Sequence, residues 1–330
     1  MTPVKPIVLP VIGFLALLGT LNTALLAGEA VTQTLSDKDA LEQVIRHLET
    51  TQGAYGAQLS EAYFQLGTTE RALENHDEAA QAFGKSLQIL RTGYGLLDLR
   101  QLPILEELLA TNQTLEDWQE VDSLHHLMHF ITSRNSEADA ELRFQSLVKL
   151  GRWKVQAEEH GLLPENENPV KQAFELYSNE IGKLEASATY QGKNIHLATL
   201  YLDIAAVEFN QAKAKYEMPI TEFELGGQSS ISTVNCITFA GRDGRPVQSC
   251  TSVEMPNPSY YMEPSNRKNM QIRQHLDAVK DDVLQAYRTL QNEPEGTDHR
   301  AALLAEVQRL TREYNDFTAM NSKSSMYRLD

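Results

Sequence analysis

The sequence is short of basic residues and lacks the short motifs of common catalytic and phosphate-binding sites. Its 330 residues include 45 acidic and 29 basic side chains, giving a formal net charge of −16. Such a chain repels phosphate backbones and releases no counterions from them, which argues against a nucleic-acid partner. The chain also has no Gly-rich phosphate loop, no nucleophile elbow and no Cys-x-x-Cys pair. We therefore expect a protein-binding molecule that is not an enzyme and uses neither cofactor nor metal.

Long apolar runs are missing except at the start of the chain. The segment 7–18 is apolar, and small or polar residues follow it. This order is typical of a secretory signal peptide at 1–30, with cleavage after Ala27 or Ala30. The stretch 7–27 is nearly long enough to span a bilayer, so an uncleaved N-terminal anchor is the alternative. In either case we expect the body of the protein outside the cytosol, periplasmic or secreted, with membrane attachment only if this segment is retained.

Cysteine is scarce, since the chain contains only Cys236 and Cys250. They lie in two runs of strand-like composition, 232–239 and 247–253, on either side of an Asp-Gly turn signal. Folding the chain about Asp243 places the two cysteines opposite each other, because each lies seven positions away. An isolated pair in an oxidising compartment is most simply structural, and the spacing is not that of a redox-active motif. The sequence predicts a disulfide-linked β-hairpin.

Proline is nearly missing between residues 36 and 216, where helix-forming residues carry apolar side chains at spacings of three and four. Six residues carry the packing pattern of the clearest pair of helices: Tyr63, Leu66 and Gly67 on the first, and Ala79, Phe83 and Leu87 on the second. Small residues at Gly67 and Ala79 let the helices approach closely while aromatic rings fill the space beside them. This segment resembles a tetratricopeptide repeat, although Glu70, Ser86 and Arg91 replace that family's usual Tyr, Ala and Pro.

The pattern recurs at an interval of 42 residues. The positions equivalent to the first helix are Leu105 and Leu108, and then Leu147, Leu150 and Gly151. A looser copy of the second helix surrounds Trp118. The apolar residues Ala40, Val44 and Leu48 predict one more helix of this type at the start of the array. The interval resembles that of the extended tetratricopeptide repeats of the kinesin light chain type. The resemblance covers residues 37–161.

This resemblance implies an all-α fold. Its helical repeats at 36–161 would form an α-solenoid, a right-handed superhelix of antiparallel helix pairs, interrupted later in the chain by the β-hairpin. Families built in this way bind peptides or helices on the concave face, which the first helix of each pair lines. The inward positions that do not pack are Glu61, Phe64, Thr68 and Arg71, and, 42 residues on, Pro103, Glu106, Ala110 and Gln113. The implied function is a scaffold for protein–protein interaction in the cell envelope.

The repeat pattern fades after residue 161. Four segments follow: 162–218, with two helices that form a degenerate pair or a cap; 219–264, the insertion that contains the hairpin; 265–320, a helical hairpin of 267–291 and 298–318; and 321–330, a tail. The insertion suggests a second hypothesis. An envelope enzyme or ligand-binding protein would have its site where the helical array meets this insertion, near Arg242, Arg245 and Tyr260.

Few side chains point to chemistry. His125 and His129 have the helical spacing of a metal-binding pair, but no third ligand is indicated, so we expect them to be structural. Acidic pairs such as Asp281 and Asp282 are expected on solvated helix faces. The net acidity is compatible with a basic protein partner and equally with a role in solubility alone.

Overall fold

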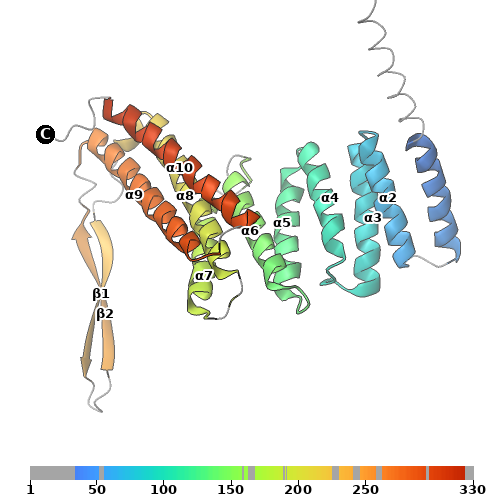
Figure 1. Cartoon of the computed structure of the whole chain (residues 1–330), viewed down its shortest axis with the longest axis horizontal. Coiled ribbons are helices and arrows are strands. Elements are labelled where there is room, and N and C mark those ends of the chain that lie inside the picture. Colours follow the sequence, from blue (N-terminus) through green and yellow to red (C-terminus); the bar gives the residue numbers. More distant parts are fainter. Residues whose placement is uncertain are drawn as a thin grey trace, which may run out of the picture. The chain divides into compact units, whose positions relative to one another are not determined.

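The computed structural model describes residues 34–51, 56–157, 160–162, 168–188, 190, 192–224, 230–240, 246–257, 262–294 and 297–323 (Figure 1). The predicted signal peptide at 1–30 lies outside these residues. The chain divides into two units, Met1–Pro169 and Val170–Asp330, and each is described by itself. Within the described ranges, no helix is long and apolar enough to cross a membrane.

Unit 1 consists of helices that pack against their neighbours in sequence. A helix at 34–51 is followed by α2 (Ala57–Ala72), α3 (His76–Tyr94), α4 (Gln101–Thr114), α5 (Trp118–Arg134) and α6 (Ala140–Ala157). From α2 to α6 each helix packs on the next, and Figure 1 shows them side by side. The turns between them are short, so successive helices run antiparallel. This confirms the expected helical pairs.

Helices α2 and α3 approach closely at Gly67. Ala79 and Phe83 are fully buried, and Phe83 fills the space over Gly67. A Cβ atom on Gly67 would lie 2.6 Å from a ring carbon of Phe83, so no larger side chain fits there without movement. The contact of a small with a large residue sets the separation of these two helices.

The interval of 42 residues is also present in the backbone of the turns. Glu74 and Glu116, 42 residues apart, are the described non-glycine residues with positive φ, at 62° and 57°. Asn75 and Asp117 follow them and occupy the N-cap positions of α3 and α5. The hydrogen bonds recur as well: the N–H groups of Leu73, Glu74 and Asn75 donate to the carbonyls of Thr69, Arg71 and Glu70, and those of Leu115, Glu116 and Asp117 donate to the carbonyls of Thr111, Gln113 and Asn112.

The upstream helix differs from the expected stripe. Val44 is 48% exposed and Ala40 is also exposed, whereas Ile45 and Leu48 are buried against α2. The predicted stripe of Ala40, Val44 and Leu48 is therefore wrong at two of its three positions. The helix is rotated about its axis by roughly one residue relative to the predicted stripe, because the apolar residues that face α2 are spaced by three positions and not by four.

Unit 2 is built around three long helices. Its elements are α7 (Pro169–Ala186), α8 (Lys193–Glu217), the 3-10 helix η1 (Ile220–Phe223), β1 (Ser230–Ala240), β2 (Pro246–Pro256), α9 (Pro264–Gln291) and α10 (Asp298–Lys323). Its core comes from α8, α9 and α10, with Phe209, Ile272 and Leu310 among its buried members. The predicted helical hairpin is present, but α10 continues to Lys323 and so enters the expected tail.

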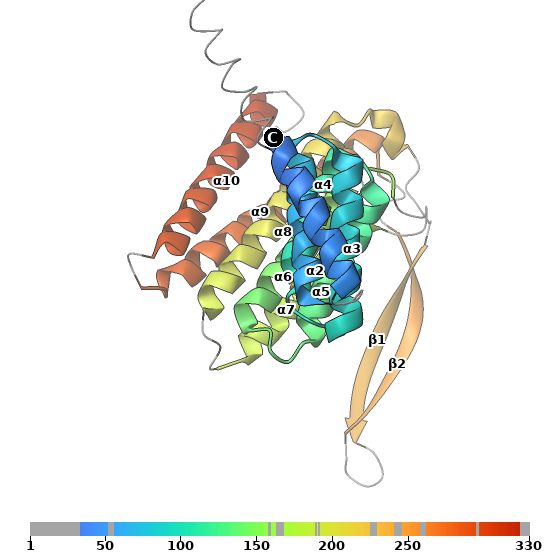
Figure 2. The same ribbon diagram turned by 90° about the vertical axis from the view of Figure 1, so that its right-hand side faces the viewer.

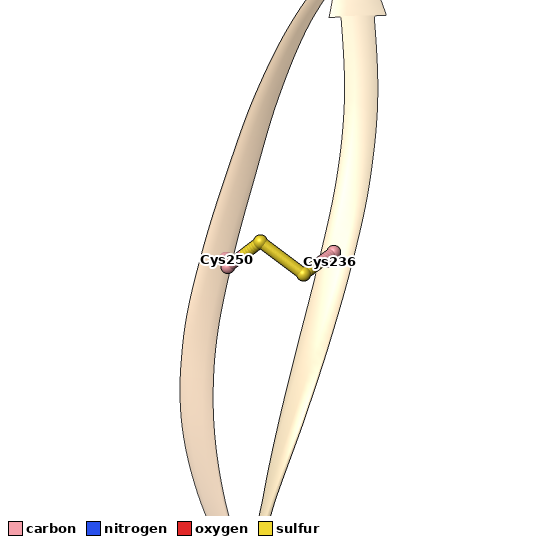
Figure 3. The surroundings of a disulfide bond; sticks show 2 residues. All are labelled: Cys236 and Cys250. Carbon is pink, nitrogen blue, oxygen red and sulfur yellow. A yellow bond between two sulfur atoms is a disulfide. The ribbon is translucent and has the colours of Figure 1, made fainter. Parts of the chain in front are cut away.

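The strands β1 and β2 form a two-stranded antiparallel sheet, which we call the ribbon. Cys236 lies directly opposite Cys250 in the register, and the two form a disulfide (Figure 3). Figure 2 shows the strands side by side along their whole length. The predicted hairpin and disulfide are confirmed, with strands longer than expected; the turn at 241–245 lies outside the described residues.

Candidate binding surface

The residues expected on the binding face lie on the accessible sides of α2 and α4. Glu61, Thr68, Glu106 and Gln113 are exposed, and so are Pro103 and Ala110, while Phe64 and Arg71 are half-buried. The residues expected to pack are different. Tyr63, Gly67, Ala79, Phe83, Leu87, Leu105, Leu108, Leu147, Leu150 and Gly151 are all buried, and Leu66 is partly buried. The two sets therefore separate into a surface and a core.

A groove with a volume of about 300 Å³ brings part of this surface together. Of the expected residues, Glu61, Phe64 and Pro103 line it. It also contains residues that the repeat pattern did not point to: Ala57, Ser60, Ser86, Leu90, Arg100 and Ile104. The groove is thus formed where α2, α3 and the start of α4 meet, and we call it the α2–α4 groove.

Phe64 is the main apolar side chain presented in the α2–α4 groove. Its ring lies 5.6 Å from the buried ring of Phe83, centroid to centroid, with the planes tilted by 54°. Tilted aromatic pairs of this separation are favourable. Phe64 is therefore held in place by the core on one side while its other side faces the groove.

Two ion pairs join the first helices of successive pairs. Arg71 on α2 contacts the Glu107 carboxylate on α4, and Lys149 Nζ on α6 lies 2.7 Å from Glu106 Oε1 on α4. These links tie two of the expected binding residues, Arg71 and Glu106, to neighbouring helices. Arg71 and Glu106 are consequently less available to a partner than Glu61 and Phe64.

Polar contacts beneath the groove explain two departures from the repeat motif. Ser86, where the motif has Ala, donates to the carbonyl of Ser60 at 2.8 Å, and Ser60 donates back to the carbonyl of Ser86 at 3.0 Å. Glu70, where the motif has Tyr, is buried and pairs with Lys38 Nζ at 2.8 Å. Both buried polar groups are satisfied by partners on neighbouring helices, as buried polar groups need to be.

The histidines lie in an aromatic cluster between α5 and α6. The ring of His125 stacks on that of Trp153 at 5.2 Å, and Trp118 lies beyond Trp153 at 6.3 Å. Burial lowers the pKa of His125 to about 4, so this side chain is neutral at physiological pH. His129 Nδ1 lies 3.4 Å from Ser146 Oγ on α6. Both histidines therefore take part in packing between helices, and the described residues hold no group of three metal-ligating side chains.

Of the acidic pair on α9, Asp281 is exposed as expected, whereas Asp282 is not fully solvated. Asp282 is half-buried, and burial, followed by the nearby Glu208 and Asp281, raises its pKa to about 6. His275, seven residues before Asp282 on α9, contacts the Glu208 carboxylate on α8. The expectation failed because α8 covers this part of α9, and the sequence places these two helices on opposite sides of the insertion.

A second, apolar groove of about 510 Å³ lies between α9 and α10. Val283, Leu284, Tyr287 and Tyr314 are among its lining residues, and Leu284 and Tyr287 are exposed. The sequence feature that could have indicated this groove is the apolar face of α9, which is too wide for one neighbouring helix to cover completely. The residues proposed for the second hypothesis, Arg242, Arg245 and Tyr260, lie outside the described residues.

Comparison of the chain with protein-family models and with curated proteins finds no match.

Proposed function

We propose that the chain is a non-catalytic scaffold of the tetratricopeptide type, which binds another protein in the cell envelope. The observation that carries this proposal is the turn geometry shared by Glu74 and Glu116. The same backbone conformation with positive φ, the same N-cap position and the same backbone hydrogen bonds recur after 42 residues, as expected for a stacked repeat. Packing of each helix on its sequence neighbours supports the solenoid part of the proposal.

The α2–α4 groove is the proposed docking site within this scaffold. It fits one apolar side chain of a bound helix or extended segment, which would contact Phe64 at the base. Glu61 on its wall is exposed and has no basic partner among the described ion pairs. A partner with a basic residue beside an apolar anchor matches this wall and the net charge of −16.

Export is the remaining part of the proposal. The apolar start of the chain has the composition of a signal peptide, and the disulfide of the ribbon is of a kind that persists in oxidising compartments. Together they support a location in the periplasm or outside the cell.

The test is site-specific crosslinking in the intact envelope. Phe64 is replaced by the photoreactive analogue p-benzoylphenylalanine, and a discrete crosslinked product with one envelope protein is expected. Phe130, which is 49% exposed on α5 and outside the groove, is the matched control and should give no such product. The change Glu61→Lys should reduce the yield from position 64. Equal products from both positions, or none from position 64, would contradict the proposed site.

A further inference from the structure

The ribbon packs mainly on itself and makes no extensive contact with the described helices. In unit 2, α8, α9, α10 and η1 pack among themselves, whereas β1 and β2 pack on each other. Val234, Val253 and Met255 are 68%, 44% and 50% exposed. A two-stranded ribbon is marginal by itself in water, and here the Cys236–Cys250 disulfide joins its strands near the middle. The protein therefore maintains a preformed strand pair, and the strand side chains that the structure describes are exposed, apart from the intermediate Ser230.

The disulfide also shows which backbone groups face outward. The Cα atoms of Cys236 and Cys250 are 4.0 Å apart, which is the short spacing of a non-hydrogen-bonded pair. In an antiparallel ladder such pairs alternate with hydrogen-bonded ones. Every second residue on each strand, counted from these cysteines, thus directs its N–H and C=O away from the partner strand.

The two outer edges of the ribbon are not equivalent. The outward residues of β1 are Ser230, Ser232, Val234, Cys236, Thr238 and Ala240, all of which have an N–H and none of which is charged. The outward residues of β2 are Pro246, Gln248, Cys250, Ser252, Glu254 and Pro256. Proline lacks the N–H, and proline and charge are the residues with which proteins block exposed edges. The edge of β2 is blocked at both ends, and the edge of β1 is open along its length.

We propose that the open edge of β1 pairs with the same edge of a second copy of the chain, giving a four-stranded sheet in a two-fold symmetric dimer. An antiparallel register centred on Asn235 matches every outward residue with an outward residue of the other copy: Ser230 with Ala240, Ser232 with Thr238, and Val234 with Cys236. The self-matching register favours a second copy at this place. Two chains with a net charge of −16 repel each other, but the β1 edges bring no charged side chain to the contact and so add nothing to that repulsion.

Two proline variants separate this pairing from the stability of the ribbon. Val234 and Ser252 lie opposite each other, and both direct their N–H outward, so proline at either position removes no backbone hydrogen bond within the ribbon. Ser252→Pro also removes the side-chain hydrogen bond between the Ser252 and Ser232 hydroxyls, so it tests the ribbon at least as severely as Val234→Pro does. Val234→Pro closes the β1 edge and Ser252→Pro closes the β2 edge. The full chain and both variants are compared by sedimentation equilibrium, with the disulfide verified by mass in each.

The unaltered chain and Ser252→Pro should dimerise equally. Val234→Pro removes one outward hydrogen bond from each copy, and the dissociation constant of its dimer should rise by about thirtyfold or more. A monomeric unaltered chain overturns the proposal. A dimer that withstands Val234→Pro overturns it as well, because contact is then made elsewhere, for instance through the apolar N-terminal segment. Equal weakening by the two variants also counts against it, since that result assigns the effect to the ribbon as a whole.

Discussion

The helices of unit 1 each bury one face against the helix before and the helix after, whereas the ribbon of unit 2 buries little. In unit 1, Phe83, Leu105 and Val121 are all fully buried on successive helices. In the ribbon, the strand side chains that the structure describes are exposed, apart from Ser230, which is intermediate. The first region is stabilised by non-covalent packing repeated along the chain, and the second by the pairing of its two strands and one covalent bond between them. The two regions should therefore respond to different perturbations.

The largest effect is expected from Phe83→Ala in unit 1. Loss of a fully buried aromatic side chain leaves a cavity between α2 and α3 and should lower the free energy of unfolding by about 3–5 kcal/mol. Chemical denaturation followed by circular dichroism measures this loss. The exposed Phe130→Ala, on α5, is the matched control, with a change of less than about 0.5 kcal/mol.

A double-mutant cycle attributes this loss to a particular contact. Gly67→Ala by itself should cost about 1–3 kcal/mol, because the added Cβ meets the Phe83 ring. In the Phe83→Ala background this ring is gone, and Gly67→Ala should then be nearly neutral or stabilising. Additive effects of the two changes would show that Gly67 and Phe83 do not set the helix separation.

The second prediction concerns the ribbon. Replacing Cys236 and Cys250 together by Ser should destabilise the ribbon by about 3 kcal/mol, the chain-entropy value for a loop of this length. Amide hydrogen exchange should accelerate in β1 and β2, while the denaturation midpoint of the helices should stay unchanged. A general loss of helical stability in this variant would mean that the ribbon supports the helices, contrary to its lack of extensive contact with the described helices.

Local patterns were sufficient for the features that depend on near neighbours. The contact of Gly67 with Phe83 follows from a small and a large residue on adjacent helices, and the pairing of Cys236 with Cys250 follows from symmetry about the turn. The partial burial of Asp282 could not be predicted, because it depends on α8 covering α9 across the insertion, which no local spacing contains. The serine pair beneath the groove was also missed, because a single serine in place of alanine does not indicate its partner.

The third prediction tests that serine pair. Ser86→Ala restores the residue of the repeat motif, yet it should cost about 1–2 kcal/mol, because Ser86 Oγ no longer donates to the carbonyl of Ser60. The double change Ser60→Ala with Ser86→Ala should cost about the sum of the single changes, since each hydroxyl donates to a backbone carbonyl that the other substitution leaves in place. Thermal denaturation of the four proteins tests this, and a cost well below the sum would contradict the two independent hydrogen bonds.

The smallest effect is expected at Asp282 in unit 2. The buried polar groups of unit 1 have hydrogen-bond or ion-pair partners, whereas burial disfavours the charged form of Asp282. The pKa of Asp282 is about 6 in the folded chain and near its ordinary value of 3.8 when unfolded. Between these values the folded state binds the extra proton, so this group's contribution makes the protein less stable as the pH rises from about 4 to about 6. Asp282→Asn should therefore stabilise the chain at pH 8 by about 1 kcal/mol, after allowance for solvent screening of a half-exposed carboxylate, and should have little effect near pH 4. Urea denaturation at both pH values checks the sign. Glu313→Gln is the control. Burial acts to raise the pKa of Glu313, but the hydrogen bonds and charges of Lys213 and Arg309 outweigh it and lower this pKa, so loss of the carboxylate should instead destabilise the chain at pH 8.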